Sequence, residues 1–291
     1  MALTSPALTL GITPLFGNIK PALDIIRKLG PTDFSAGSDG IMEIKPGATI
    51  KVPVSSVSKA LAYDDSTNNY LTGGSTGWAN LSAAHYLQGF DISGVNVDQG
   101  CDAAKFKQLF AYRAGKGICM AAIDAVKTAL DGATTSTGVT LASSADYAAY
   151  AGLAADVAWL NKADSVLAVN GSEWAAIVAA CAAKNVVRRE DIVSGLGFAD
   201  IVVVPGMTAR AVIVPAGAFG TLSRVPAIIA RYLEAGVETD EESGLSVGIV
   251  VADDQAKNRL VCNGDIWFGA TLISANAAAT SAGVIKVGTA G

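Results

Sequence analysis

Residues 102–132, DAAKFKQLFAYRAGKGICMAAIDAVKTALDG, decide the fold. Apolar side chains recur there every three or four positions, which is the spacing of an amphipathic helix. This is the longest segment of the chain with that spacing. Strand-like and turn-rich sequence precedes it, and short helical and strand-like segments alternate after it. We therefore expect one long helix around which the other elements are arranged.

The apolar face of this helix changes halfway along. Phe106 and Phe110 share a face in the first half, whereas Val126 lies on a different face in the second, since successive residues are rotated by about 100°. Gly115 and Gly117 lie between the halves, and each weakens a helix by roughly 1 kcal/mol relative to Ala. The sequence predicts a helix that joins two subdomains and has a hinge at these glycines.

The chain before the long helix has two parts. Residues 1–15 show no period and predict an extended arm, and the apolar residues of 19–29 then predict a short amphipathic helix that stops at Gly30-Pro31. Further on, strict alternation over residues 49–54 predicts a strand. It opens a segment of about 40 residues that has two strand-like arms and no helix. Such a segment is too small to close a core, so we expect a projecting loop that needs a partner surface.

The chain after the long helix predicts a small α/β subdomain and then a hairpin. The subdomain has a loop at 133–143, a helix capped by Ser143 or Ser144, a helix capped by Ser172, a short polar helix near 188–194, and strands at 166–169, 201–204 and 211–214. Strands at 245–252 and 259–273 flank a polar turn and form the hairpin. The acidic residues 238–242 predict a solvated turn.

Composition limits the classes of function. The 291 residues are 51% hydrophobic and 16% charged, against roughly 25% charged in an ordinary soluble domain. Either the core is large, or further apolar surface is buried between subunits. No apolar run reaches the roughly 20 residues of a membrane span, and the N-terminus lacks the basic region of a signal peptide, so we expect a cytosolic chain. The net charge of −5 argues against sequence-specific binding of nucleic acid, but not against a weak local contact.

No segment carries a convincing catalytic or ligand-binding pattern. Residues 73–77 match G-x-S-x-G, but the buried strand and the helix that a nucleophile elbow needs are missing. Residues 114–117 lack two positions of a phosphate loop. The four cysteines lack metal or redox spacing, which indicates free buried thiols, and His85 is the single histidine. We expect no enzyme, no cofactor and no metal site, and we expect His85 to be a strand residue with a satisfied hydrogen bond.

The order of these segments resembles the major capsid proteins of tailed bacteriophages, which have the Hong Kong 97-like fold. Four segments carry the resemblance. KPGATIKVPVSSVSKALAYDD (45–65) is similar to the outgoing limb of the extended loop, and AKFKQLFAYRAGKGICMAAIDAVKTAL (104–130) to the spine helix. DVAWLNKADSVLAVNGSEWAAIVAACAAKN (156–185) is similar to the axial domain, and LSVGIVVADDQAKNRLVCNGDIWFGATLI (245–273) to the hairpin of the peripheral domain.

This resemblance implies an α+β fold with an N-terminal arm and short helix (1–37), an extended loop (38–84), a peripheral domain (85–132 and 236–291) with the spine helix 102–132, and an axial α/β domain (133–235). The loop would lie over a neighbouring subunit, with contacts expected from Ile50, Lys51, Val52, Val54 and Lys59.

The implied function is a major capsid protein that self-assembles into the hexamers and pentamers of an icosahedral head enclosing double-stranded DNA. Its partners would be copies of itself, scaffolding and portal proteins, a decoration protein and the DNA, bound without sequence specificity. Assembly would occur in the host cytoplasm and the product would be part of the virion. Two alternatives stay open: the shell of an encapsulin-like nanocompartment, and a soluble α/β enzyme with an unrecognised site.

Overall fold

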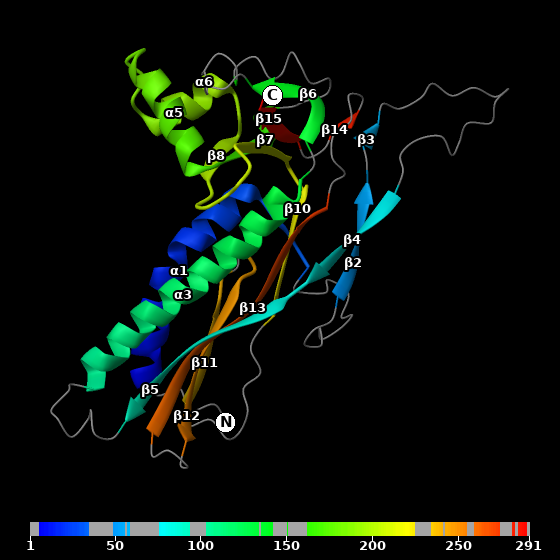
Figure 1. Cartoon of the computed structure of the whole chain (residues 1–291). Coiled ribbons are helices and arrows are strands. Elements are labelled where there is room, and N and C mark those ends of the chain that lie inside the picture. The colour runs from blue at the N-terminus through cyan, green and yellow to red at the C-terminus, as the bar shows by residue number, and fades with distance from the viewer. Residues whose placement is uncertain are drawn as a thin grey trace.

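The computed structural model describes residues 6–34, 49–55, 57–58, 76–93, 103–133, 135–141, 150, 162–224, 234–240, 242–254, 259–273, 281–282 and 285–289. Two long helices lie side by side against a six-stranded sheet, a five-stranded sheet with its own helices lies beyond their ends, and a narrow hairpin projects away from both (Figure 1). None of the helices in this described part of the chain is long and apolar enough to cross a membrane.

The expected long helix is present as α3, Ala103–Asp131. Its second half buries Ile118, Ala122, Val126 and Leu130, which confirms the apolar face predicted for that half. The side chains of Phe106, Leu109 and Phe110 lie outside the described residues. The helix runs unbroken through both glycines, so packing along its length outweighs their low helix propensity.

The N-terminal region differs from the prediction. Helix α1 extends over Pro6–Leu29, so the extended arm predicted for residues 1–15 is wrong from Pro6 onward. The second half of α1 is anchored in the core, where Ile19, Leu23 and Ile26 are buried. Extending a helix is far easier than starting one, and a first-turn proline is well tolerated. The anchored half therefore carries helical structure into a segment of weak propensity.

The larger sheet has the strand order β1-β10-β13-β12-β11, and β5 also pairs with β13. Strands β12 and β13 are antiparallel, which confirms the predicted hairpin. Strand β10, which falls in the predicted axial segment 133–235, belongs to this sheet instead. The strands are β1 Thr32–Asp33, β5 Ala84–Ser93, β10 Phe219–Arg224, β11 Glu234–Thr239, β12 Ser246–Asp254 and β13 Arg259–Leu272.

The smaller sheet has the order β6-β15-β9-β7-β8 and is covered by α5 (Gly171–Ala182) and α6 (Arg189–Leu196). Three of its strands and both helices were predicted. Two features were not predicted: residues 133–143 contain a strand, and the C-terminal strand joins this sheet, beside β9, and not the larger sheet. The strands are β6 Thr135–Leu141, β7 Ser165–Val169, β8 Asp200–Val203, β9 Ala211–Pro215 and β15 Ile285–Thr289. A 3-10 turn, Lys162–Asp164, precedes β7.

The N-cap of helix α5 lies two residues earlier than expected. The side chain of Asn170 accepts a hydrogen bond from the backbone N–H of Glu173 at 2.7 Å, so Asn170 is the N-cap and the predicted Ser172 is inside the helix. Asn and Ser are similarly good caps, so the choice depends on which residue keeps an extended backbone. Asn170 does so because it directly follows β7 and its own N–H is bonded to Arg210 in the neighbouring loop.

One hydrophobic cluster joins the two sheets. It contains α1 and α3 residues such as Leu23 and Val126, residues of the larger sheet such as Phe268, and residues from one side of the smaller sheet such as Val212. The other side of the smaller sheet forms a second cluster with α5 and α6. The smaller sheet is therefore packed on both faces, and it cannot separate from the helix pair without exposing part of the main core.

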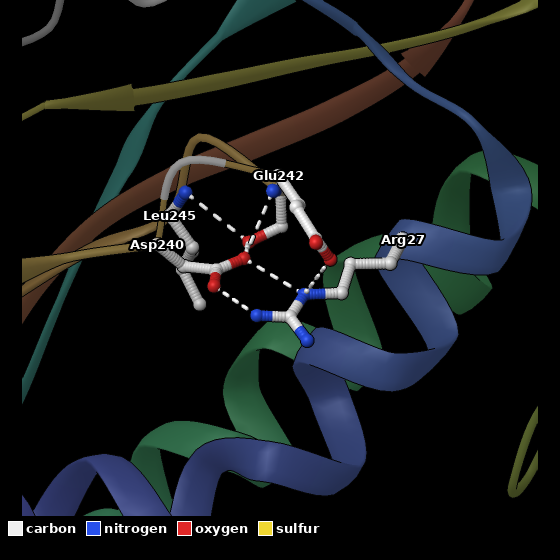
Figure 2. Close-up of polar contacts among 5 residues, drawn as sticks. Arg27, Asp240, Glu242 and Leu245 are labelled. Atoms are coloured by element: carbon white, nitrogen blue, oxygen red, sulfur yellow. Dashed lines mark hydrogen bonds and ion pairs between the residues drawn. The ribbon is translucent and has the colours of Figure 1, made fainter.

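The C-terminal end of α1 is held by charge as well as by packing (Figure 2). The guanidinium of Arg27 pairs with the carboxylate of Asp240, which also accepts bonds from the backbone N–H and hydroxyl of Ser243, at 2.9 and 2.5 Å. Glu242 pairs with the same guanidinium at 3.1 Å. Asp240 is only 7% exposed. The prediction that this acidic stretch is a solvated turn is therefore wrong for Asp240, because Arg27, 213 residues away, neutralises it.

The ends of both helices also contact the smaller sheet. Lys28 pairs with Asp200 at the start of β8, at 2.9 Å. The Asp131 carboxylate at the end of α3 accepts hydrogen bonds from the backbone N–H groups of Thr208 and Ala209, at 3.0 and 2.8 Å. Burial opposes ionisation of Asp131, but these bonds outweigh it and lower the pKa of its carboxyl. Arg27 and Lys28, which are adjacent in α1, thus bind the larger and the smaller sheet respectively.

Replacing Asp240 by Asn tests the first of these contacts. Burial opposes its ionisation, but bonds from Arg27 and Ser243 outweigh that effect, so the pKa of the Asp240 carboxyl is below its ordinary value of 3.8. A lowered pKa stabilises the fold above the ordinary value, and this stability is lost as the pH falls through the folded-state pKa. We expect Asp240→Asn to lower the free energy of unfolding of the subunit by about 2 kcal/mol at neutral pH.

The difference from the wild type should shrink as the pH falls from about 5 to about 2 in urea denaturation. Asp24→Asn, on the exposed side of the same helix, is the matched control and should change stability little. A difference that stays constant down to the lowest pH would contradict the role given to the Asp240 charge.

Candidate assembly surface

The projecting hairpin consists of β2 (Thr49–Ser55) and β4 (Thr76–Ser82). They pair antiparallel from Thr49 opposite Ser82 to Ser55 opposite Thr76. This confirms the predicted strand and the predicted return of the chain. Residues opposite each other in an antiparallel pair project from the same face, so the register divides the side chains into two sets.

The inner set packs within the subunit. Val52 is 1% exposed and forms a small cluster with Leu81, Ala83 and Leu222, and Ile50 packs against its edge. The alternation predicted for β2 is therefore correct, and it turns Val52 toward the larger sheet of its own chain. Burial of this side fixes the orientation of the hairpin, because a shift of one residue would reverse both faces.

The outer set faces solvent and includes a large apolar pair. Pro53 lies opposite Trp78, and Lys51 lies opposite Asn80; all four are on the exposed side. Trp78 is 67% exposed, which is unusual for the largest apolar side chain. Trp side chains that lie in the open in a free subunit are typical anchors of protein interfaces. The outer face is the candidate assembly surface.

The predicted contact residues are thus divided between the faces. Lys51 is exposed on the outer face, Val52 is buried on the inner one, and Ile50 and Val54 are partly buried. Lys59 lies outside the described residues. Sequence reasoning missed Trp78. A signal was available, since Trp78 lies one and three residues from partly buried Ala79 and buried Leu81, which puts it on the opposite face of the strand. Without the register with β2, however, that face could not be assigned.

The base of the hairpin is fixed at its crossing over β13. Gly269 lies directly against the backbone of Ser82, where any side chain would collide. Beyond this crossing, His85 in β5 stacks on Trp267 with 4.3 Å between ring centroids and contacts Asp265 at 2.6 Å through Nε2. Burial raises the pKa of the Asp265 carboxyl, and His85 partly offsets this. The prediction that His85 is a hydrogen-bonded strand residue is confirmed.

The suspected chemical motifs do not form sites in the described chain. Thr76 and Gly77 of the G-x-S-x-G sequence belong to β4, so no helix follows the motif, and residues 114–117 lie inside α3. Cys119 and Cys181 are free and buried. Among the residues that the structure describes, no three His, Cys, Asp or Glu side chains are grouped to hold a metal ion.

One buried polar group joins helix α5 to its surroundings. Glu173 accepts hydrogen bonds from the Tyr150 hydroxyl at 2.6 Å and from two nitrogens of Arg210, both at 2.9 Å. Burial, and then the bond to Glu173, raise the pKa of Tyr150, so the phenol stays protonated. Both carboxylate oxygens are engaged by the protein itself. This group ties α5 to the segment before β9.

The two glycines predicted as a hinge have different surroundings. Gly115 is buried within α3. A Cβ at Gly117 would lie 3.1 Å from the side chain of Gln88 in β5, which indicates that strand and helix approach closely there. Close packing is thus a second reason for a glycine at 117. The hinge itself stays a prediction.

Comparison with known proteins gives no match in sequence and a match in fold. No family model matches the chain, and no curated protein matches it. The crystal structure of a virus-like particle from Pyrococcus furiosus is similar, with a TM-score of 0.50 at 10% identity over 94% of this chain and 96% of that one. Mycobacterium phage Cain is similar with a TM-score of 0.48 at 14% identity, over 93% of this chain and 90% of that one. The capsid of cyanophage P-SCSP1u is similar with a TM-score of 0.44 at 9% identity, over 84% of this chain and 93% of that one.

At such low identity these similarities establish the fold alone, and only the first score is high enough to support an argument. The match covers 94% of this chain and 96% of that one, so it extends over most of the fold. The chain therefore has the fold of a virus-like-particle subunit, and the resemblance to Hong Kong 97-like capsid proteins is confirmed at the level of the fold.

Proposed function

We propose that this chain is a capsid protein that self-assembles into a closed shell. The observation that carries the proposal is the likeness in fold to a virus-like particle over 94% of this chain and 96% of the other. The exposed Trp78 and Pro53 of the hairpin, and the low content of charged residues, support it independently. Each of these features leaves apolar surface that a second subunit would bury.

In its finer form the proposal has the shell built from hexamers and pentamers around double-stranded DNA, as part of a bacteriophage virion assembled in the host cytoplasm. Scaffolding, portal and decoration proteins would be its partners. The larger sheet with α1 and α3 would be the peripheral domain, and the smaller sheet the axial domain, with β10 and β15 exchanged between the predicted segments. Lys51 on the outer face of the hairpin, and Lys59, would contact a neighbouring subunit.

Negative-stain electron microscopy of the purified chain tests the proposal. Closed particles of uniform size support a shell, and a folded monomer that shows catalytic turnover overturns it. Nuclease treatment and analysis of the contents then separate the two kinds of shell. Packaged DNA supports the capsid, whereas an enclosed enzyme supports the encapsulin-like alternative.

The two faces of the hairpin predict opposite effects of two substitutions. Trp78→Ser should leave the free energy of unfolding of the subunit within about 0.5 kcal/mol of the wild type, since Trp78 is exposed, and should strongly reduce the yield of particles. Val52→Ala should cost about 2 kcal/mol in subunit stability, because it leaves a cavity in the cluster with Leu81.

Chemical denaturation measures stability, and sedimentation or microscopy measures particle yield. Val187→Ser is the matched control: Val187 is 75% exposed, but it lies between α5 and α6, far along the chain from the hairpin. Normal particle yield from the Trp78 variant would show that the outer face of the hairpin is not an assembly surface.

The hinge proposal predicts an effect on the particle and not on the subunit fold. Replacing Gly115 and Gly117 by Ala should stiffen α3, since each Ala favours the helix by roughly 1 kcal/mol. If the helix bends during assembly, closed particles should form more slowly while the helical circular dichroism of the subunit is kept. Gly117→Ala alone controls for displacement of the Gln88 side chain. An unchanged assembly rate in the double variant would exclude the hinge.

A further inference from the structure

The edge strands of the larger sheet differ in how well they are protected. Edges of natural sheets are kept from pairing with other chains when the strand is short or carries charged side chains. Strand β1 is two residues long, and β11 has two glutamates among its six residues. Strand β5 is ten residues long and contains no lysine, arginine or proline and a single acidic residue, Asp91. Of the described strands only β13 pairs with β5, so the second edge of β5 has no partner among them (Figure 1).

Exposed apolar side chains flank this edge on both faces of the sheet. Tyr86 packs against the main cluster with the helices, so the adjacent Leu87 projects from the opposite face of β5, where it is 54% exposed. On the helix side, Met120 of α3 is 59% exposed. Unpaired backbone groups with apolar side chains on both sides make this edge suited to association with another strand.

Met120 lies on the side of α3 that runs along β5. A Cβ at Gly117 would lie 3.1 Å from the side chain of Gln88 in β5. Burial, and then the charge of Asp124, raise the pKa of the Tyr86 phenol, so Asp124 also lies near β5. Met120 is three residues after Gly117 and four before Asp124, which places all three on one side of the helix. It therefore lies at about the level of the β5 residue between Gln88 and Tyr86.

We infer that the open edge of β5 pairs antiparallel with β5 of a second copy of this chain, about a two-fold axis that passes near Leu87. Two-fold contacts, in which both copies use the same surface, are the commonest contacts between identical subunits. The axis brings the Leu87 side chains of the two copies together on one face of the joined sheet and their Met120 side chains together on the other. The inference rests on the proposed function and names one contact by which copies join.

The charges of α3 near this axis are complementary. Two α3 helices related by an axis near Met120 run antiparallel, so residue 116 of one copy lies opposite residue 124 of the other. Lys116 and Asp124 are both exposed and carry opposite charges, so the axis creates two ion pairs between the copies. Arg113 and Lys127 lie seven residues from Met120 and carry like charges, so the charges favour the contact only close to the axis.

The edge is also long enough for a specific contact. At about 3.3 Å per residue, β5 is about 33 Å long. The strand and the helix beside it are together about 15 Å deep, from a strand spacing of about 5 Å and a helix diameter of about 10 Å. This strip covers roughly 500 Å² on each copy and about 1,000 Å² in total, which is the lower limit for a specific interface. The pairing alone therefore supports a weak dimer, and a shell needs other contacts as well.

Oxidation of a Leu87→Cys variant of the full chain tests the pairing. Opposite residues of an antiparallel pair have Cβ atoms about 4.5–5.5 Å apart, which is close to the geometry of a disulfide. We expect most of the chain to run as a reducible dimer on a denaturing gel. The controls are the wild type and Val187→Cys, which is also exposed but lies between α5 and α6, and both should give at least tenfold less dimer. Equal dimer yields from the two cysteine variants overturn the inference.

Charge reversal tests the position of the axis. Lys116→Glu alone and Asp124→Lys alone should each weaken self-association in sedimentation at least tenfold, because like charges then lie opposite each other. The double variant should return to within about threefold of the wild type, since both ion pairs are restored in reverse. Within one helix these positions are about 12 Å apart, so the rescue cannot arise inside a subunit. With every variant folded by circular dichroism, a double variant that associates no better than the single ones overturns the inference.

Electron microscopy of the same samples separates this inference from the proposed function. Wild-type particles without the Leu87→Cys dimer reject the pairing of β5 and leave the shell in place. Dimers without wild-type particles support the pairing and reject the shell. Formation of neither rejects both.

Discussion

The two long helices bury their apolar sides against two sheets at once, and the rest of the fold depends on this shared core. A fully buried Ile or Leu contributes about 1.5–3 kcal/mol, and α1 alone buries four of them, Ile19, Leu23, Ile26 and Leu29. The larger sheet covers the core along the helices, and one side of the smaller sheet covers it at their ends. Neither sheet could remain in place if the helix pair were removed.

Ion pairs and hydrogen bonds then fix the position of the helix ends on the two sheets, which apolar packing alone would leave adjustable. Arg27 binds the turn before β12, Lys28 binds the start of β8, and Asp131 binds the loop before β9. Apolar contacts are non-directional, whereas these bonds have defined partners and geometry. Together they set the angle between the two sheets.

The hairpin shows why a projecting element can be stable without a core of its own. One face packs against the larger sheet through Val52 and Leu81, and the close approach of Ser82 to Gly269 fixes the base of the hairpin. That leaves the other face, with Pro53 and Trp78, exposed. The same division holds for the helix layer, whose inner side is core and whose outer side is exposed, as at Lys20 and Lys116. In both places the period of the secondary structure separates buried from exposed side chains.

The sequence by itself determined the long helix, the hairpin β12–β13, the alternation in β2 and the α/β order of the second half, because each depends on a local period of apolar residues. It also determined the order of segments from which the capsid-like fold was predicted. Tertiary structure decided the rest. Because of Gly11 and Pro14, the sequence did not predict the start of α1, which is held by contacts with α3. Nothing near residue 240 in the sequence indicates that Arg27 neutralises Asp240. Likewise β15 joined the smaller sheet, and Trp78 faced outward, through pairings with distant strands. Local patterns carry no information about such partners, because the contacts that stabilise them are made only when the chain has folded.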